Sequence, residues 1–510
     1  MIKEPRVLLV YPPNQLMPIE TPRPDGSLGP LYLAGALERL DIQTDILDAS
    51  VGFSEDDLKD TFCKSVMQPN GLIRIGMSSE RIKEFIAKRK YNVIGINSNF
   101  TPQTRMALEV AQAAKDVSPE ILVVAGGINA RNLYGRFLKD GLVDIICTTE
   151  GEKIFVDLVL TWSMGLPFSL VDGVIYKKDG QYISQPAKPE SYFTDLDKLP
   201  MPQWQKLPFD KYERIASPHG ALATGGERYA PLMTSRGCPF KCAYCHISTE
   251  KSSPEDIGNL RLKSVDRVME EIRILKFLGV KKIFIEDDSL LAKKARVKQI
   301  FEKLLNAGLK IADVNGVNLV HFAIGGKGNK LEIDRDYLQL LKSAGFDQIV
   351  FPVESASQRI LDKYATGKLD HGKQDVVELT RIAREVGITC PINMMIGFPD
   401  ETEEEMLQSV ELGKKLVDAG ADYCTFFIPI PFPGSQLYNI AIRDGYLDKD
   451  FDPDFMNWKT AIMKNTIVSP QRIIEIRDWA WRAVNTNEHV ERRLKESAGS
   501  RWVSGAPDNK

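Results

Sequence analysis

The segment VIGINSNFTPQTRMALEVAQAAKDVSPEILVVAGG, residues 93–127, decides the fold of the first part of the chain. A short apolar run ends in Asn97 and Ser98, an amphipathic stretch follows, and a second apolar run ends in Gly126 and Gly127. Apolar residues spaced three and four apart in the middle stretch indicate a helix between two buried strands. This order predicts a strand–helix–strand unit, which builds a parallel sheet covered by helices on both faces.

The same alternation extends on both sides of this unit, through about residue 164. Apolar runs at 6–13, 44–50 and 144–150 predict three more strands, and 28–40 and 151–162 have helical spacing. We therefore expect an α/β, doubly wound Rossmann-like domain over 1–164, whose ligand crevice lies at the carboxyl ends of its strands. The stretch 53–89 is expected to add one or two helices. The predicted binding residues at the strand ends are Asn14, Asp48, Ser50, Asn97, Ser98, Gly126, Gly127, Glu150 and Gly151.

The remaining chain divides into three predicted parts. Residues 165–228 contain a β-hairpin, with its turn at 177–180, and then a Pro- and Asp-rich linker. Six strand–helix units over 229–440 predict a partial (β/α)6 barrel, with strands at 230–236, 281–287, 314–320, 348–355, 390–397 and 424–430. Residues 441–510 are expected to form a small helical region with a disordered tail at 504–510.

Composition excludes several classes of protein. The 510 residues carry 66 Lys and Arg against 69 Asp and Glu, a net charge of −3, so there is no basic footprint for nucleic acid or an acidic membrane surface. No apolar run approaches the ~18–20 residues of a membrane span. The N-terminal apolar run resembles a first strand and not a signal peptide. We expect a cytoplasmic protein that binds neither nucleic acid nor membrane.

Three of the seven cysteines lie within eight residues, in TSRGCPFKCAYCHIS, residues 234–248. Cys238, Cys242 and Cys245 are too close and too many for a disulfide pattern, so they indicate a metal site. Zinc usually takes four ligands in two pairs, and no second pair follows. A 4Fe–4S cluster held by three thiolates, with one iron left open, fits better. A zinc site and a chance grouping remain the alternatives.

The cysteine loop resembles that of the radical S-adenosylmethionine (SAM) superfamily. CPFKCAYC matches the Cys-x3-Cys-x2-Cys pattern of that superfamily, including the aromatic Tyr244 before the third cysteine. The resemblance implies that the open iron chelates SAM and that an electron from the cluster cleaves SAM to a 5′-deoxyadenosyl radical. It also implies an external electron donor, such as flavodoxin or ferredoxin.

Later segments resemble the SAM pocket of the same superfamily, in the expected order. In IFIEDDSLL the resemblance places Glu286 and Asp287 near the methionine amino group, and in PVESASQRIL it places Glu354 and Ser355 near the ribose, with Lys368 following. MMIGFPDET resembles a GFPGET segment that packs near the adenine, with Asp400 in the place of the common Gly. The other expected contacts are Asn393, Gly397 and Pro429. Taken singly, these acidic residues could be helix caps and the glycines ordinary turns.

The first domain resembles the cobalamin-binding domain that precedes the barrel in cobalamin-dependent radical SAM enzymes. VLLVYPPN, AGGINA and CTTEGEKIF carry the resemblance. The cobalamin fingerprint Asp-x-His-x-x-Gly is not complete, because the chain has Ser50 where the fingerprint has His. The resemblance implies that cobalamin binds without a protein imidazole on cobalt. A vestigial domain, kept for stability or for shaping the substrate cavity, is the alternative.

With both cofactors, the resemblance implies a class B radical SAM methyltransferase acting on an unactivated carbon of a small-molecule substrate. A cobalamin-dependent cyclase or rearrangement enzyme, as in anaerobic tetrapyrrole ring formation, is the alternative with the same parts. A non-catalytic iron–sulfur redox protein is the alternative from another class. A methylthiotransferase would need further N-terminal cysteines, and only Cys63 and Cys147 are present there.

Overall fold

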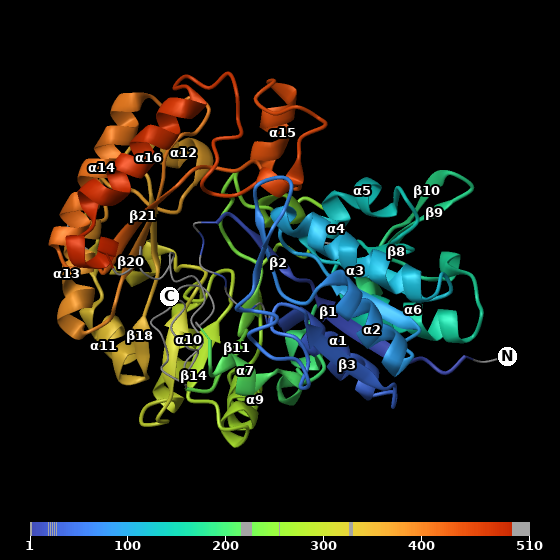
Figure 1. The fold of residues 1–510 in the computed structure, drawn as a ribbon. Coiled ribbons are helices and arrows are strands. Elements are labelled where there is room, and N and C mark those ends of the chain that lie inside the picture. Colours follow the sequence, from blue (N-terminus) through green and yellow to red (C-terminus); the bar gives the residue numbers. More distant parts are fainter. Residues whose placement is uncertain are drawn as a thin grey trace. The chain divides into compact units, whose positions relative to one another are not determined.

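The computed structural model describes residues 3–18, 20, 22, 24, 26, 28–215, 227–253, 256–325 and 330–491. The chain divides into two compact units, Met1–Arg228 and Tyr229–Leu494 (Figure 1). The expected disordered tail, residues 504–510, lies outside the described residues. Within the described part of the chain, no helix combines the length and the apolar character that crossing a membrane would need.

A seven-stranded sheet with the order β10-β9-β8-β7-β6-β1-β3 forms the centre of the first unit. Its parallel strands are β1 (Val7–Tyr11), β3 (Thr44–Asp48), β6 (Val93–Asn97), β7 (Leu122–Gly126) and β8 (Ile145–Cys147). Counted along the chain, these five have the order 2-1-3-4-5 of a doubly wound fold. The strands are buried almost throughout, as expected when both faces are covered. The prediction of a Rossmann-like sheet is confirmed.

Helices follow the strands of this sheet in sequence. They are α1 (Leu28–Glu38), α2 (Ser79–Arg89), α3 (Thr104–Val117), α4 (Ile128–Asn132), α5 (Tyr134–Leu138), α6 (Gly151–Ser163) and α7 (Phe209–Tyr212). The carboxyl ends of the parallel strands therefore lead into helix starts, where backbone N–H groups are available to a ligand.

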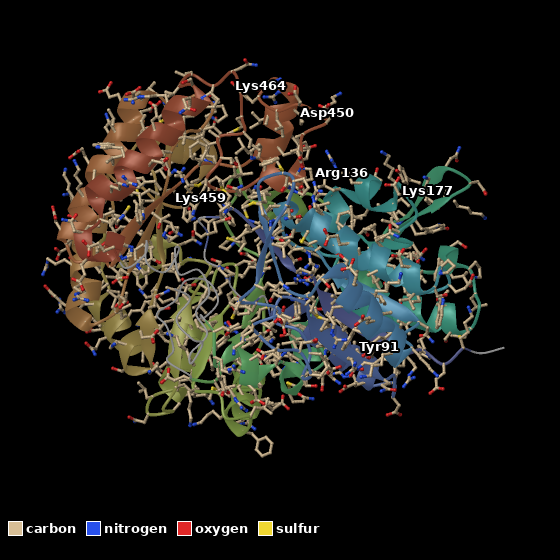
Figure 2. All side chains as sticks on the ribbon, in the orientation of Figure 1. Tyr91, Arg136, Lys177, Asp450, Lys459 and Lys464 are labelled. Atoms are coloured by element: carbon tan, nitrogen blue, oxygen red, sulfur yellow. The ribbon has the colours of Figure 1, made fainter. Side chains whose placement is uncertain are left out.

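The hairpin that the sequence assigns to a separate connecting segment is instead one edge of this sheet. Strands β9 (Val174–Lys178) and β10 (Gln181–Gln185) pair antiparallel, and β9 pairs antiparallel with β8. Asp179 and Gly180 both have positive φ, at 50° and 80°, as a tight two-residue hairpin turn requires. Lys177, labelled on this hairpin in Figure 2, belongs to β9. Its ammonium group donates to the carbonyl of Lys139, 2.9 Å away, and so ties the hairpin to the end of α5.

The stretch 53–89 contains one helix, α2, and two strands that the sequence does not predict. Strands β4 (Ser65–Met67) and β5 (Ile73–Ile75) form a small antiparallel sheet with β2 (Asn14–Leu16). All three side chains of β4 are exposed. An exposed three-residue strand has no apolar alternation, which explains why it gave no signal in the sequence.

A row of parallel strands forms the partial barrel of the second unit. The strands are β11 (Tyr229–Leu232), β14 (Lys282–Ile285), β15 (Lys310–Asp313), β18 (Phe346–Gln348), β19 (Phe351–Glu354), β20 (Pro391–Met395) and β21 (Tyr423–Phe427). Gln348 bridges to Thr389 in the same register that pairs Phe351 with Ile392, so β18 and β19 are two pieces of one strand. Six strand positions result, and the expected (β/α)6 barrel is confirmed. The small two-stranded sheets β12 (Ser235–Arg236) with β13 (Arg261–Leu262) and β16 (Ala323–Ile324) with β17 (Glu332–Ile333) lie in its loops.

The described helices of the second unit begin after a capping Ser, Thr or Asp side chain, except those that begin at Ile247 and Lys294. They are α8 (Ile247–Glu250), α9 (Val265–Phe277), α10 (Lys294–Lys303), α11 (Arg335–Ser343), α12 (Gln358–Tyr364), α13 (Val376–Val386), α14 (Glu403–Asp418), α15 (Gln436–Arg443) and α16 (Pro470–Val484). At α14, Thr402 and Glu405 form a reciprocal capping box. The last helix, α16, packs on α14 and β21, and the Asn485 side chain hydrogen-bonds both the N–H and the carbonyl of Cys424. The described part of the C-terminal region therefore completes the second unit.

The third barrel strand lies upstream of its predicted position. The sequence places it at 314–320, whereas β15 ends at Asp313. Asp313 accepts a hydrogen bond from the N–H of Gly316, whose φ is +85°, so the chain turns directly after the strand. The apolar residues Val317 and Leu319 belong to the following loop and to a 3-10 helix, η7 (Leu319–Phe322). Because Val317 and Leu319 are buried although they lie outside a strand, their alternation with polar residues resembles that of a strand.

Candidate cofactor sites

The three-cysteine loop follows β12 and is anchored through its backbone at its start and in its middle. The N–H of Cys238 donates to Gly258 O at 3.1 Å, that of Ala243 to Tyr364 O at 2.7 Å, and that of Leu437 to Ala243 O at 2.7 Å. Gly237 has a φ of +79°, and a Cβ there would lie 2.3 Å from Asn259 O. Only glycine fits this close approach.

The three thiols lie close enough together for the charge of one to affect another. Cys242 is buried, and Cys238 and Cys245 are half-buried. Burial raises the pKa of Cys245 to about 12, and Cys242 and Cys238 both add to that rise. An iron cluster would supply the positive charge that favours the thiolate forms. The donor set, three soft sulfur ligands on one anchored loop, fits a 4Fe–4S cluster.

Asp287 supports the start of this loop. Its buried carboxylate accepts hydrogen bonds from the N–H of Thr234 (2.5 Å) and from the hydroxyls of Thr234 and Ser235 (both 2.6 Å). Burial raises its pKa, and these hydrogen bonds oppose the rise. The neighbouring Asp288 accepts from the N–H of Gly237 at 2.7 Å. Asp287, predicted to bind the cofactor, therefore holds the loop through its carboxylate, whereas Glu286 at the same strand end is half-buried.

Glu354 stands at the end of β19 and joins the cysteine loop to Lys368. Its Oε1 accepts from the Tyr244 hydroxyl at 2.9 Å and from the Lys368 ammonium group. Burial disfavours the charge on Lys368, but Glu354, Cys242 and Cys245 together raise its pKa above the ordinary value. Glu354 has a φ of +68°, an unusual conformation for a residue with a side chain. The structure thus brings together Tyr244, Glu354 and Lys368, which the sequence proposed separately.

The other predicted SAM-pocket residues differ in how open they are. Ser355 is fully buried, and its hydroxyl accepts from the N–H of Ser357 and lies 3.4 Å from Ser409 Oγ. Gly397 has a φ of +99°, and its N–H donates to the buried Glu401. Asn393 is half-buried in β20, and Pro429 is buried after β21. Of these residues, Ser355 has its hydroxyl bonded within the protein and is fully buried, so its side chain is not exposed to a ligand.

At the carboxyl edge of the first sheet, the end of β3 is closed by protein contacts. Asp48 and Ser50 are buried, and Asp48 accepts from the N–H and hydroxyl of Ser50 at 2.9 and 2.6 Å. The Tyr212 hydroxyl donates to the other Asp48 oxygen at 2.7 Å. Burial raises the pKa of Asp48, and these bonds oppose the rise. Lys211 donates to the carbonyls of Val51 and Asp56 and so fixes the next turn.

The ends of β6, β7 and β8 lie side by side in the sheet and are more open. Asn97, Gly126, Glu150 and Gly151 are half-buried there. Gly127 has a φ of +102°, and a Cβ on it would lie 2.5 Å from Ser98 O, so only glycine lets these backbones approach. Asn14 lies in β2 and pairs with Ile75.

Two residues at this edge carry buried polar atoms that no other described residue hydrogen-bonds: Asn129 Oδ1 and Thr149 Oγ1. Asn129 donates through Nδ2 to the hydroxyls of Ser98 and Thr104 at 2.9 and 3.0 Å. Because the Thr104 hydroxyl donates to Thr101 O, it must accept from Asn129, which fixes the amide orientation. Buried polar atoms normally have a hydrogen-bond partner. These two oxygens are therefore suited to accept hydrogen bonds from a ligand rich in amide groups. Sequence patterns do not reveal these two atoms, since a buried polar atom without a partner arises only in the packed structure.

Asp313, at the end of β15, is a further buried acid that the sequence did not single out. One carboxylate oxygen accepts from the N–H groups of Gly316 and Val350, and the other has no partner among the described residues. Burial raises its pKa to about 7, against the hydrogen bonds that lower it. An Asp in an unfolded chain titrates at about 3.9, so the contribution of Asp313 to stability is present at low pH and is lost as the pH rises from about 4 to 7.

Comparison with known protein families agrees with this geometry. Residues 232–413 match the Radical SAM superfamily, and residues 26–159 match the B12 binding domain family. The chain belongs to the cobalamin-dependent radical SAM enzymes. A 4Fe–4S cluster, SAM and cobalamin are accordingly the cofactors of this cobalamin-dependent radical SAM enzyme.

Two similar proteins cover both units of the chain. An uncharacterized methyltransferase of Pyrococcus horikoshii is 28% identical over 418 residues, 82% of this chain and 80% of that protein. The cytidylyl-2-hydroxyethylphosphonate methyltransferase of Streptomyces wedmorensis is 27% identical over 491 residues, 90% of this chain and 85% of that protein. The structure of the radical SAM methyltransferase TsrM of Kitasatospora setae has the same fold, with a TM-score of 0.61 at 16% identity over 86% of this chain and 75% of that one.

Proposed function

We propose that this enzyme is a class B methyltransferase that methylates an unactivated carbon of a small-molecule substrate. One observation carries the proposal: the two similar proteins that span both units are both named methyltransferases.

We propose that Cys238, Cys242 and Cys245 hold the cluster and that Glu286 and Glu354 contact SAM. When bound, the cluster and SAM supply a 5′-deoxyadenosyl radical and cobalamin supplies a methyl group. The anchored backbone of the loop limits how far the thiolates can move, and three thiolates on a four-iron cluster would leave one iron without a protein ligand. Lys368 neutralises Glu354 and adds positive charge beside the thiolates. Reducing equivalents come from an external donor such as flavodoxin or ferredoxin.

On the first unit, we propose that the corrinoid is held by its periphery at the ends of β6, β7 and β8. Gly126 and Gly127 would allow close backbone approach, and Asn129 and Thr149 would bind corrin amide groups through their unpartnered oxygens. Both Asp48 oxygens are occupied by protein donors, and Ser50 is a poor cobalt ligand compared with imidazole. We therefore propose a lower cobalt face without a protein nitrogen ligand.

A cyclase is the second candidate, because anaerobic magnesium-protoporphyrin IX monomethyl ester cyclases are also similar. The Rubrivivax gelatinosus cyclase is 25% identical over 76% of this chain, and the Synechocystis cyclase is 20% identical over 92% of it. The Streptomyces methyltransferase combines 27% identity with 90% coverage, and this higher identity over a nearly full-length match favours methyl transfer.

An anaerobic assay of the reconstituted protein with SAM and a reductant separates the two candidates. A methyltransferase consumes SAM in two ways and releases both S-adenosylhomocysteine, after methyl donation, and 5′-deoxyadenosine. Both products are measured by mass spectrometry in the presence of candidate substrates. Release of 5′-deoxyadenosine without S-adenosylhomocysteine would favour the cyclase and contradict the proposal.

A further inference from the structure

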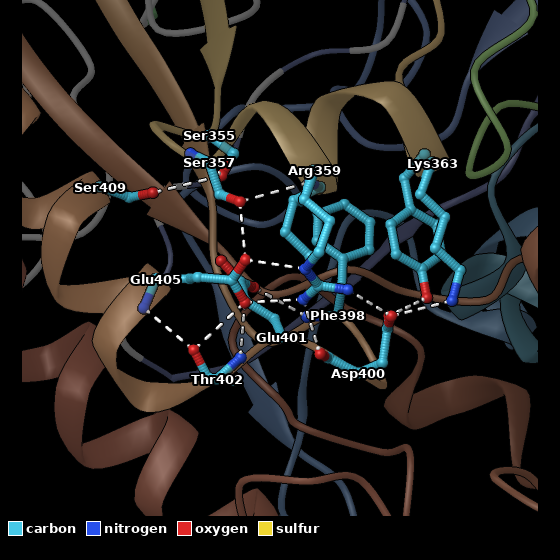
Figure 3. Close-up of polar contacts among 12 residues, drawn as sticks. Ser355, Ser357, Arg359, Lys363, Phe398, Asp400, Glu401, Thr402, Glu405 and Ser409 are labelled. Atoms are coloured by element: carbon cyan, nitrogen blue, oxygen red, sulfur yellow. Dashed lines mark hydrogen bonds and ion pairs between the residues drawn. The ribbon is translucent and has the colours of Figure 1, made fainter.

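Asp400 occupies a position where the resembling GFPGET segment carries Gly, and in this protein its carboxylate has three partners on α12 (Figure 3). The Tyr364 hydroxyl donates to Oδ1 at 2.6 Å, and Lys363 and Arg359 donate to Oδ2 at 2.9 and 2.7 Å. A second Arg359 nitrogen donates to the Asp400 carbonyl at 2.8 Å. One acidic side chain therefore contacts α12 near both of its ends, at Arg359 and at Lys363 and Tyr364.

Arg359 extends this contact to α14. Its guanidinium group also donates to both carboxylate oxygens of Glu405, at 2.9 and 2.7 Å, and Glu405 accepts from the Ser357 hydroxyl that caps α12 (Figure 3). Partial burial opposes the charge on Asp400, but its hydrogen bonds lower the pKa to about 2. The network is therefore ionised at neutral pH.

Tyr364, the last residue of α12, connects this network to the cysteine loop. Its carbonyl accepts a hydrogen bond of 2.7 Å from the N–H of Ala243, the residue between Cys242 and Tyr244. Its ring stacks on Phe398, with centroids 4.3 Å apart and planes 15° apart. Phe398 lies in the same GFPD segment as Asp400, and its ring also lies 6.1 Å from that of Tyr244. The segment expected near the adenine and the loop expected to hold the cluster thus meet at one tyrosine.

We infer that Asp400 is a positioning residue, which fixes Tyr364 so that the cysteine loop and the GFPD segment keep one relative geometry. Glycine at this position would leave Arg359, Lys363 and the Tyr364 hydroxyl without this carboxylate. Asp400 itself contacts neither thiols nor, in this account, SAM. The inference rests on the proposed function in one respect, that this loop and this segment together form the SAM site.

The test compares Asp400→Asn and Tyr364→Phe with the matched control Glu403→Gln. Glu403 is three residues away and its exposed carboxylate also pairs with an arginine, Arg472 at 2.6 Å, but on α16 and not on α12. Tyr364→Phe removes only the hydroxyl and keeps the ring and the carbonyl. Each reconstituted protein is measured for iron, SAM affinity, melting temperature and the electron paramagnetic resonance change that SAM causes in the reduced cluster.

We expect both test variants to retain iron and to bind SAM roughly two- to thirtyfold more weakly, the range in which residues without ligand contact alter binding. When SAM is added, the paramagnetic resonance signal of the reduced cluster should broaden or change less in these variants than in the wild type. Glu403→Gln should match the wild type in both SAM affinity and this signal change. The double variant should be no weaker than the weaker single one, since both act through one hydrogen bond. Wild-type SAM affinity in Asp400→Asn overturns the inference, and so does an equal loss in Glu403→Gln. A wild-type protein that binds no cluster would instead contradict the proposed function.

Discussion

Replacing Glu354 by alanine should destabilise the second unit more than any single change to a surface ion pair. The side chains of Glu354 and Lys368 are only 8% and 13% exposed, so the substitution leaves a buried ammonium group without its partner. Breaking a buried pair in this way usually removes about 3–5 kcal/mol of stability. For a unit of this size that is a fall in melting temperature on the order of 10 °C.

A second substitution separates the two roles of Glu354. In Glu354→Ala/Lys368→Met no charge remains buried, and the main loss left is the hydrogen bond from Tyr244, worth about 1–2 kcal/mol. The double variant should therefore regain much of the melting temperature. Its SAM affinity should stay one to two decades below that of the wild type, because a charge-assisted hydrogen bond to SAM is worth roughly 1.5–3 kcal/mol.

The measurements are thermal unfolding of the cluster-free protein and SAM binding to the reconstituted protein. Glu411→Ala is the control, since its pair with Lys414 is exposed and such pairs contribute about 0–1 kcal/mol. Equal melting temperatures for Glu354→Ala and the control would refute the reasoning about burial. A double variant that recovers SAM affinity together with stability would show that Glu354 does not contact SAM.

Three further predictions address the other sites. Alanine at any one of the three loop cysteines should abolish iron binding in colorimetric assays, whereas Cys390→Ala, which changes a cysteine buried in the barrel, should leave it intact; equal loss would refute the cluster assignment. Thr149→Val and Asn129→Ala should each lower the corrinoid retained after gel filtration, as read by its visible absorbance, and undiminished retention in both would show that the corrinoid lies elsewhere. Asp313→Asn removes a group whose stabilising effect fades from about pH 4 to 7, so the melting temperature of the variant relative to wild type should rise over that range; a constant difference would contradict this.

The sequence predicted the architecture well, because both units are built from apolar strands that alternate with helices, most of them amphipathic. It misplaced the third barrel strand because Val317 and Leu319 are buried in a loop. It missed β4, whose exposed side chains follow no pattern. It also separated the hairpin from the first sheet, since the pairing of β9 with β8 depends on contacts between segments that local patterns do not record.

The site was predictable where a motif fixes the chemistry and less so where packing decides it. The spacing of the cysteines was sufficient to propose the cluster. The sequence could not separate Glu286 from Asp287, because only the fold shows that Asp287 is enclosed by Thr234 and Ser235. The unpartnered oxygen of Thr149 and the contacts of Asp400 were equally invisible, since each depends on residues distant in the chain.

The most direct test of the central claim is one anaerobic preparation in which iron, sulfide and corrinoid are quantified together and the cobalt(II) form is examined by paramagnetic resonance. We predict about four iron, about four sulfide and about one corrinoid per chain, with no splitting from an axial nitrogen ligand. Iron without any retained corrinoid after reconstitution would contradict the claim that both cofactors work in this protein. Nitrogen splitting from a protein ligand would contradict the proposed mode of cobalamin binding.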